Sequence, residues 1–469
     1  MAHIETQAWP RLVIAGTHSG VGKTSAVLGV LGALRRRGLQ VQGFKVGPDF
    51  IDPMYHREVT GVPSHNLDSW LMGPEGVRRA FARVAPSAGV SIIEGVMGLF
   101  DGRATGPDGS TAEVAALLQA PVLLVVDVGG MSRSAAALVQ GYARFDPAVR
   151  IAGVVLNRVG GERHYRLVKT AIEAQAGVPV WGYLPWDETL VLPERHLGLV
   201  PVEEDAAFRR VCTALGEAAG ASIDLQAVLA SAQAAPPLEL PTDAGTTPQA
   251  TKARIGVARD AAFNFYYEAN FLWFRHWGAE LVEFSPMGDA ELPLDVDALY
   301  FGGGFPEVFA KPLADNYRFL AALRRVQQTG LPIYAECGGL MYLVEAIQDA
   351  AGTRYAMAGL LPGVCRLTDR LQNFGYKEVV SLRDSLLGPA GLRTRGHEFH
   401  YSVWEGRPTA SSLYRTRSSH GDECDEGYSD GPLTASYVHL HFDTCPQVAR
   451  SLVENAAAYR ERRLRYGSA

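Results

Sequence analysis

Residues 12–24 read LVIAGTHSGVGKT, an apolar run that leads into a glycine-rich loop, and residues 25–37 then have the composition of a helix. A loop between a strand and a helix is typical of phosphate binding, because glycines let successive backbone N–H groups point inward. In such a loop Lys23 supplies charge to the β- and γ-phosphates, and the Thr24 hydroxyl can bind Mg²⁺. The stretch therefore predicts an ATP site on a parallel sheet.

The spacing of this loop departs from the usual G-x-x-x-x-G-K-T. Thr17 stands where the first glycine is expected, and Gly16 comes one residue earlier. A purely structural turn is the alternative, but the flanking strand and helix favour phosphate binding. We expect Gly20 and Gly22, together with the lysine and threonine that follow, to hold ATP.

Apolar runs alternate with helix-like segments through the first half of the chain. They lie at residues 12–15, 41–46, 91–93, 122–126, 151–156 and 180–184. This alternation predicts parallel strands with helices on both faces, the α/β class. A second series follows at residues 254–258, 279–284, 298–301 and 332–335, and residues 359–403 favour strands over helices.

Residues 230–252 have a linker composition, rich in alanine, proline and threonine. They predict a domain at 1–229, a linker at 230–252 and a second domain at 253–469.

The composition bounds the function. The chain has 469 residues, of which 47% are hydrophobic and 20% charged, and its formal net charge of −6 includes no basic block. These values favour small-molecule ligands over nucleic acid, and no apolar run approaches the roughly 20 residues that span a bilayer. The first residues lack an apolar signal core, so we expect a cytoplasmic location. The five scattered cysteines indicate neither a disulfide framework nor a metal cluster.

Polar residues lie at the ends of two of the predicted strands, where open α/β sheets bind ligands. Lys45 is expected to reach phosphate oxygens, and Asp49 and Glu94 to bind Mg²⁺, with caps of helices or turns as the alternative. Asp52 and Asp101 are candidates for binding the second substrate.

Asn157 follows a later strand and is a candidate for reading the purine base of ATP. A helix-capping asparagine is equally compatible with the sequence.

Residues 334–340 read YAECGGL and place Cys337 at a sharp turn between an apolar strand and a short helical run. Such a turn exposes a nucleophile, and a helix N-terminus favours the thiolate. A buried cysteine acting as a small hydrophobe is the alternative that this segment leaves open.

Taken together, the motifs resemble the cobyrinate a,c-diamide synthase family, which includes the hydrogenobyrinate a,c-diamide synthases of aerobic cobalamin biosynthesis. The resemblance covers nearly the whole chain. Its motifs lie at residues 16–24, 45–53, 94–102, 301–307, 336–340, 395–402 and 437–442. It implies an N-terminal P-loop-type domain, similar to dethiobiotin synthetase, fused to a C-terminal class I glutamine amidotransferase α/β domain.

The resemblance also implies roles in the second domain. Cys337 attacks the glutamine amide, His439 is its base, and Gly303 and Gly304 form the oxyanion hole. Class I amidotransferases usually place a glutamate two residues beyond the histidine to orient it, but His441 stands there, so the orienting group stays open. His397, Glu398 and His400 are candidates for pocket or interface roles.

The implied reaction joins ammonia from L-glutamine to a substrate carboxylate that ATP, with Mg²⁺, has activated as an acyl phosphate. The acceptor would be a corrinoid polycarboxylate amidated at its a and c acetates. Alanine- and arginine-rich usage favours hydrogenobyrinate slightly over cobyrinate. Another amidotransferase-ligase, such as a cobyric acid synthase or a nickel-sirohydrochlorin diamide synthase, is the rival, and a non-enzymatic ATP-binding switch is a rival of another class. A homodimer is a further expectation from the family.

Overall fold

The computed structural model describes residues 5–7, 9–103, 105–192, 206–240 and 247–466. The described residues form two compact units, the first reaching to 240 and the second beginning at 247. Within these ranges no helix is both long and apolar enough to cross a membrane.

The first unit is built on a seven-stranded parallel sheet, in the order β4-β3-β5-β2-β6-β7-β8. Apart from the antiparallel pair β1 and β9, its strands belong to this sheet. The strands are β1 (Glu5–Gln7), β2 (Arg11–Gly16), β3 (Val41–Val46), β4 (His65–Leu67), β5 (Val90–Glu94), β6 (Val122–Asp127), β7 (Ile151–Val159), β8 (Val180–Pro185) and β9 (Leu238–Leu240).

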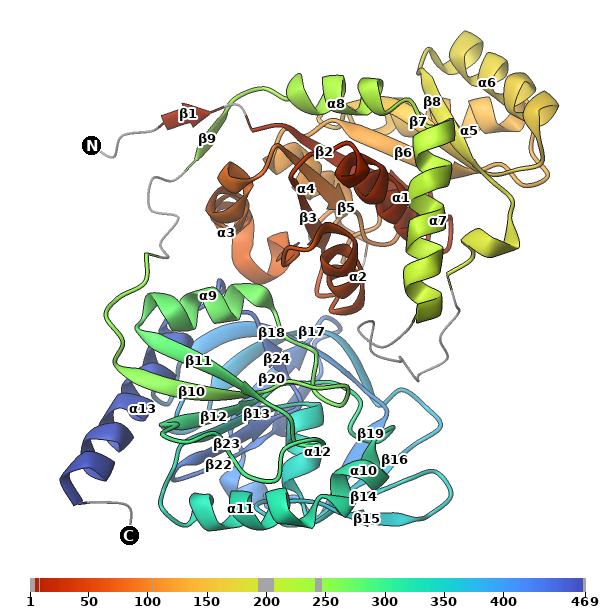
Figure 1. Cartoon of the computed structure of the whole chain (residues 1–469). Coiled ribbons are helices and arrows are strands. Elements are labelled where there is room, and N and C mark those ends of the chain that lie inside the picture. The colour runs from red at the N-terminus through yellow and green to blue at the C-terminus, as the bar shows by residue number, and fades with distance from the viewer. Residues whose placement is uncertain (1–4, 8, 104, 193–205, 241–246, 467–469) are drawn as a thin grey trace. The chain divides into compact units, whose positions relative to one another are not determined.

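Helices cover both faces of this sheet (Figure 1). Alternate residues of β2 explain why, since Leu12 and Ile14 pack against α1 and α8, whereas Val13 and Ala15 join the core on the other face with α3 to α6. The helices are α1 (Lys23–Arg36), α2 (Ile51–Thr60), α3 (Ser69–Val84), α4 (Thr111–Leu117), α5 (Ser134–Phe145), α6 (Glu162–Ala176), α7 (Ala206–Ser222) and α8 (Leu225–Gln233), with one-turn helices at Ala85–Ser87 and Glu188–Leu190.

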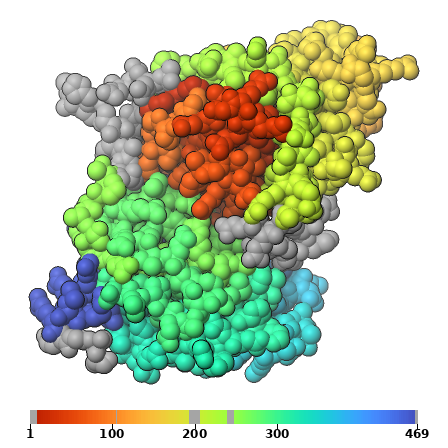
Figure 2. All heavy atoms as spheres, viewed as in Figure 1, coloured from red at the N-terminus to blue at the C-terminus, as the bar shows by residue number. Residues whose placement is uncertain are grey.

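The second unit is built on a six-stranded sheet in the order β11-β10-β12-β13-β23-β22, parallel except for the edge strand β22. Its strands are β10 (Ala253–Ala258), β11 (Ala279–Phe284), β12 (Ala298–Phe301), β13 (Ile333–Glu336), β22 (Tyr428–Asp430) and β23 (Leu433–Ser436). Ile333 and Ala335 pack with α11 and α12, and Tyr334 packs on the opposite face with α9 and α13. The helices are α9 (Glu268–His276), α10 (Ala310–Asp315), α11 (Tyr317–Gln327), α12 (Gly338–Leu343) and α13 (Gln447–Tyr466), with a one-turn helix at Thr409–Ser411. The last turns of α13, in blue, stand out at the surface in Figure 2.

Two smaller sheets complete the second unit. An antiparallel sheet has the order β21-β20-β17-β18-β24, and a mixed sheet has the order β15-β14-β16-β19. Their strands are β14 (Ala346–Gln348), β15 (Arg354–Ala356), β16 (Val364–Leu367), β17 (Asn373–Ser381), β18 (Arg393–His400), β19 (Ser402–Glu405), β20 (Tyr414–Ser418), β21 (Glu423–Glu426) and β24 (His439–Leu440).

The predicted α/β class with two parallel sheets is confirmed, and every apolar run expected to be a strand is one. The short edge strand β4 was not predicted. The predicted linker includes the end of α8 and all of β9, besides residues 241–246, which lie outside the described ones. Leu238 of β9 is buried in the first core, so residues of linker-like composition here form part of that domain.

Candidate active sites

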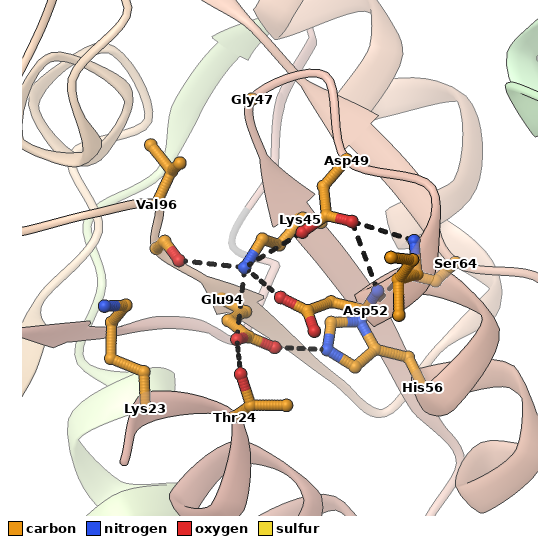
Figure 3. A network of polar contacts seen from close by, with 12 residues as sticks. Lys23, Thr24, Lys45, Gly47, Asp49, Asp52, His56, Ser64, Glu94 and Val96 are labelled. Carbon is orange, nitrogen blue, oxygen red and sulfur yellow. Dashed lines mark hydrogen bonds and ion pairs between the residues drawn. The ribbon is translucent and has the colours of Figure 1, made fainter. Parts of the chain in front are cut away.

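The first candidate site lies where β3 and β5 end beside the start of α1 (Figure 3). Lys45 and Glu94 are register partners on these strands, and Glu94 is fully buried. Thr24, in the first turn of α1, donates a hydrogen bond of 2.7 Å from Oγ1 to Glu94 Oε1. Residues predicted to share the magnesium site from separate motifs therefore meet in space.

Lys45 stands at the centre of this network. Its Nζ donates to Asp52, to Glu94 Oε1 at 3.1 Å and to the Gly95 carbonyl at 3.1 Å, and lies 3.8 Å from Asp49 Oδ2. Burial disfavours the charge, yet the surrounding carboxylates raise the pKa of Lys45. The amine therefore stays protonated.

The two acids closest to Lys45 respond differently. Burial would raise the pKa of Glu94, but Lys45 and the hydrogen bonds from His56 and Thr24 lower it. Burial and the nearby charge of Glu94 raise the pKa of Asp52. The site thus holds one firmly ionised carboxylate beside one that takes up a proton more readily.

His56, on the inner face of α2, is a member that the sequence did not reveal. It is fully buried, its Nε2 donates to Glu94 Oε2 at 2.7 Å, and its Nδ1 lies 3.0 Å from Ser64 Oγ. Because the ring holds Oε2, the Oε1 atom is left facing Thr24 and Lys45. His56 lies four residues after Asp52 on α2, so helical spacing could have placed the two side chains on the same face of the helix.

The phosphate loop itself is close-packed. Lys23 Nζ donates to the His18 carbonyl at 3.2 Å, and burial, then Lys45, lowers the pKa of Lys23. Gly22 adopts φ 94°, and a β-carbon there would overlap the Asn157 amide. Asn157 Nδ2 donates to the Val21 carbonyl at 2.9 Å, which ties β7 to the loop.

A cavity of about 410 Å³ opens beside the loop. It is lined by Gly20, Gly22, Lys23, Thr24 and Asn157, and by residues after β8, including Trp186, Asp187 and Leu190. Its position and mixed lining suit a nucleotide.

Two acids predicted from the sequence also serve as caps. Asp49 Oδ1 accepts the Ile51 N–H at 2.8 Å at the start of α2, and Asp101 Oδ2 accepts the Gly98 N–H at 2.9 Å within its own turn. Asp49 still faces Lys45 through its other oxygen, whereas no hydrogen bond or ion pair described here links Asp101 to Lys45.

The second candidate site surrounds Cys337. This residue joins β13 to α12 with φ 47° and ψ −102°, a strained conformation for a side-chain-bearing residue. Such strain is typical of functional sites, and only 5% of the residue is exposed. The sulfur faces a small cavity lined by Glu307, Phe399 and His400.

The thiol differs from the expectation of a low pKa at a helix N-terminus. Burial, followed by the charges of Glu307 and Glu398, raises the pKa of Cys337, and the Gly338 N–H opposes this rise. The expectation was wrong because the short helix α12 adds little positive potential, while burial and nearby carboxylates both disfavour the thiolate.

The glycine triplet runs past the cysteine. The Gly303 N–H donates to the Phe265 carbonyl at 3.3 Å, whereas the Gly304 nitrogen lies 3.0 Å from where a β-carbon on Gly338 would stand. The Gly338 N–H interacts with the Cys337 sulfur, and Gly304 lines the same small cavity as Cys337. Gly338 is thus a candidate oxyanion donor that was not predicted.

His439 lies on β24 against the same triplet, and a β-carbon on Gly303 would overlap its ring. Burial, then His397 and His400 on β18, lowers the pKa of His439 to about 3. The ring is therefore neutral, as a proton acceptor must be.

Comparison with known proteins follows the same division of the chain. Residues 12–200 match the CobQ/CobB/MinD/ParA nucleotide binding domain, and residues 254–446 match the CobB/CobQ-like glutamine amidotransferase domain. A protein of Priestia megaterium named cobyrinate a,c-diamide synthase is 46% identical over 97% of this chain and 98% of its own. Another of that name, from Dehalococcoides mccartyi strain CBDB1, is 43% identical over 95% of this chain and 98% of its own.

The chain belongs to the cobyrinate a,c-diamide synthase family. Family membership places a nucleotide-binding domain and a glutamine amidotransferase domain on one chain, as predicted. The predicted activity, that of a glutamine-dependent cobyrinate a,c-diamide synthase, is the activity of this family.

The first site of this family member fits Mg²⁺. Thr24 and Glu94 offer hard oxygen donors, the ligand type that Mg²⁺ prefers. Among the described residues no three His, Cys, Asp or Glu side chains form a ready cage.

Proposed function

We propose that this chain uses ATP and L-glutamine to amidate the a and c acetate carboxylates of cobyrinate. One observation carries the proposal: a phosphate loop with the paired Lys45 and Glu94 in one domain, and in the other a strained Cys337 with His439 packed against the neighbouring glycine triplet, occur on one chain of this family. The relatives' names favour cobyrinate, and hydrogenobyrinate is the alternative acceptor.

In the proposed first reaction, the Cys337 sulfur attacks the side-chain amide carbon of glutamine. His439 takes the thiol proton and passes it to the departing nitrogen, so that ammonia leaves and a glutamyl thioester remains. Gly304 and Gly338 are the proposed oxyanion donors, because the Gly338 N–H interacts with the sulfur and Gly304 lines the same cavity. Water then hydrolyses the thioester to glutamate.

In the proposed second reaction, a substrate carboxylate attacks the γ-phosphorus of ATP, and ADP leaves. Ammonia then attacks the acyl phosphate and displaces phosphate, giving the amide. Gly20, Gly22, Lys23 and Lys45 are proposed to hold the phosphates, and Thr24, Glu94 and Asp49 to hold Mg²⁺, which neutralises phosphate charge. Asn157 is proposed to bind the nucleotide, and Asp52 and Asp101 the acceptor.

Mass spectrometry of the product tests the proposal directly. The full chain is incubated with ATP, glutamine, Mg²⁺ and either cobyrinate or hydrogenobyrinate. We expect a product in which two carboxyl groups have become amides, and its absence from both corrinoids would contradict the proposal. Ammonium chloride in place of glutamine separates failure of the glutaminase from failure of the ATP-dependent ligase.

A further inference from the structure

Position 441, where related amidotransferases place a glutamate, supplies no acid in this chain. His441 Nδ1 instead lies 3.9 Å from Asp443 Oδ2, and its ring packs 4.6 Å from that of Tyr267. A buried histidine that accepts a proton still needs an anion close by, because burial alone disfavours the imidazolium. The pKa of His439 is about 3, so its imidazolium form requires a nearby anion to be stable.

Glu336, the last residue of β13, is close to this histidine. Its Oε2 lies 3.9 Å from His439 Nδ1, and both residues are buried. That spacing is longer than a hydrogen bond, as contacts in active sites often are before substrate binds. The acid and the nucleophile are adjacent in sequence, and adjacent residues of a strand point to opposite faces.

The carboxylate of Glu336 is held by three donors. The Tyr300 hydroxyl donates to Oε2 at 2.8 Å, while the Tyr334 hydroxyl and the Leu440 N–H donate to Oε1. Burial raises the pKa of Glu336 to about 7, and these donors oppose the rise. A carboxylate fixed in this way has little freedom to turn away from the ring.

Glu398, on β18, is the competing acid. Its Oε2 lies 3.1 Å from Lys377 Nζ and its Oε1 lies 3.2 Å from His400 Nε2. Lys377 therefore offsets its charge, and both of its oxygens are engaged elsewhere. Among the described residues, the ionisable groups that face His439 include Glu336 on β13 and His397, Glu398 and His400 on β18, and the charge of Glu398 raises the pKa of His439 against the effect of burial.

We propose that Glu336 is the positioning residue for His439, taking the place of the missing glutamate at position 441. Accepting a hydrogen bond from Nδ1–H, it keeps Nε2 as the atom that receives the Cys337 proton, and its charge stabilises the imidazolium that forms. The inference rests on the proposed glutaminase reaction.

The test compares Glu336→Gln with the wild-type full chain in glutamine hydrolysis. We expect kcat to fall roughly 10- to 100-fold, less than loss of the base itself, with KM changed by less than about threefold. Because Glu336, with its pKa of about 7, is the anion that the wild type loses as the pH falls, the acidic limb of the kcat/KM profile near pH 7 should disappear in the variant. Amidation supported by ammonium chloride stays at the wild-type rate.

Asp297→Asn is the matched control. Asp297 is also a fully buried acid of the second unit, but it binds the Arg254 N–H and Arg463 rather than His439. We expect this variant to lose stability without a shift in the pH profile of glutamine hydrolysis.

Two further variants keep the test decisive if Glu336→Gln does not fold. Tyr300→Phe and Tyr334→Phe each remove one donor to the acid, which raises the pKa of Glu336, so the lost activity should return as the pH rises. A wild-type kcat and pH profile in a folded Glu336→Gln protein overturns the inference, as does a larger loss and profile shift in Glu398→Gln. Wild-type protein that fails to hydrolyse glutamine instead overturns the proposed function.

Discussion

Each candidate site contains a buried glutamate beside a buried histidine, but the two pairs differ in charge. Glu94 lies 2.7 Å from His56 and has a lowered pKa, whereas Glu336 lies 3.9 Å from His439 and has a pKa raised to about 7. Lys45, 3.1 Å from Glu94, accounts for the difference, because Glu336 is held by neutral hydroxyl and amide donors.

The comparison shows that burial raises the pKa of a carboxyl group and that a neighbouring cation lowers it. The first site keeps a fixed negative charge, which suits a metal ion and phosphate chemistry. The second holds groups whose pKa values are shifted by their surroundings, which suits proton transfer.

The strongest test of whether the two sites carry out separate reactions is Cys337→Ala. Glutamine-dependent amidation should fall at least about 10³-fold because the nucleophile is lost. Ammonium-supported amidation should continue, since it uses only the first site. Glutamine hydrolysis that persists in the variant would show that another group is the nucleophile.

Lys45→Met tests the charge balance of the first site. It leaves the buried Glu94 without its cation, so we expect the free energy of unfolding to fall by roughly 3–5 kcal/mol. Urea denaturation measures this, with Lys23→Met as the matched control. Lys23 contacts a carbonyl rather than the acids, so its loss should cost less than about 1 kcal/mol while still abolishing ATP use. Equal losses in the two variants would refute the central role of Lys45.

The placement of several site residues could be predicted from the sequence. Apolar runs placed the strands, and because parallel strands end at one edge, Lys45 and Glu94 were expected to meet near Thr24. The predicted turn between strand and helix likewise placed Cys337 correctly between β13 and α12.

The rest depended on tertiary packing. Glu336 adjoins Cys337, so alternation along the strand predicts opposite directions and gives no reason to link it to His439. The raised pKa of Cys337 depends on burial and on Glu307 and Glu398, which come from separate segments. From the sequence, Gly303 and Gly304 were equivalent candidates for oxyanion donors. In the structure the Gly303 N–H donates to the Phe265 carbonyl, a contact that the sequence does not indicate.

His56→Asn tests whether the first histidine positions Glu94. The shorter side chain loses the bond to Oε2, so the Mg²⁺ concentration for half-maximal ATP-dependent amidation should rise about 10-fold. Glutamine hydrolysis is the internal control, because its residues lie in the second unit. Ser64→Ala, which removes only the outer partner of the ring, should give a smaller rise, and an unchanged Mg²⁺ requirement in His56→Asn would rule out the positioning role.

The smallest effect concerns stability and pH in the second unit. His439 has a pKa of about 3 when folded, against an ordinary value of 6.5. The unfolded chain therefore gains a proton first as the pH falls, so the stability contributed by the neutral ring is complete above about pH 6.5 and is lost toward pH 3. Glu336, raised to about 7 from 4.5, acts in the opposite direction: its contribution is complete below pH 4.5 and is lost as the pH rises to 7.

Because the contributions of His439 and Glu336 to stability depend on pH in opposite directions, replacing one residue should leave the pH dependence of the other unopposed. Between about pH 7.5 and 5.5, Glu336→Gln should lose stability more steeply than the wild type, and His439→Gln less steeply, each by on the order of 1 kcal/mol. Urea denaturation at the two pH values measures the slopes. The first site should not contribute to the difference, because it is the same in all three proteins. Parallel slopes in all three proteins would mean that burial does not shift this pair, and the contrast between the two glutamates would then fail.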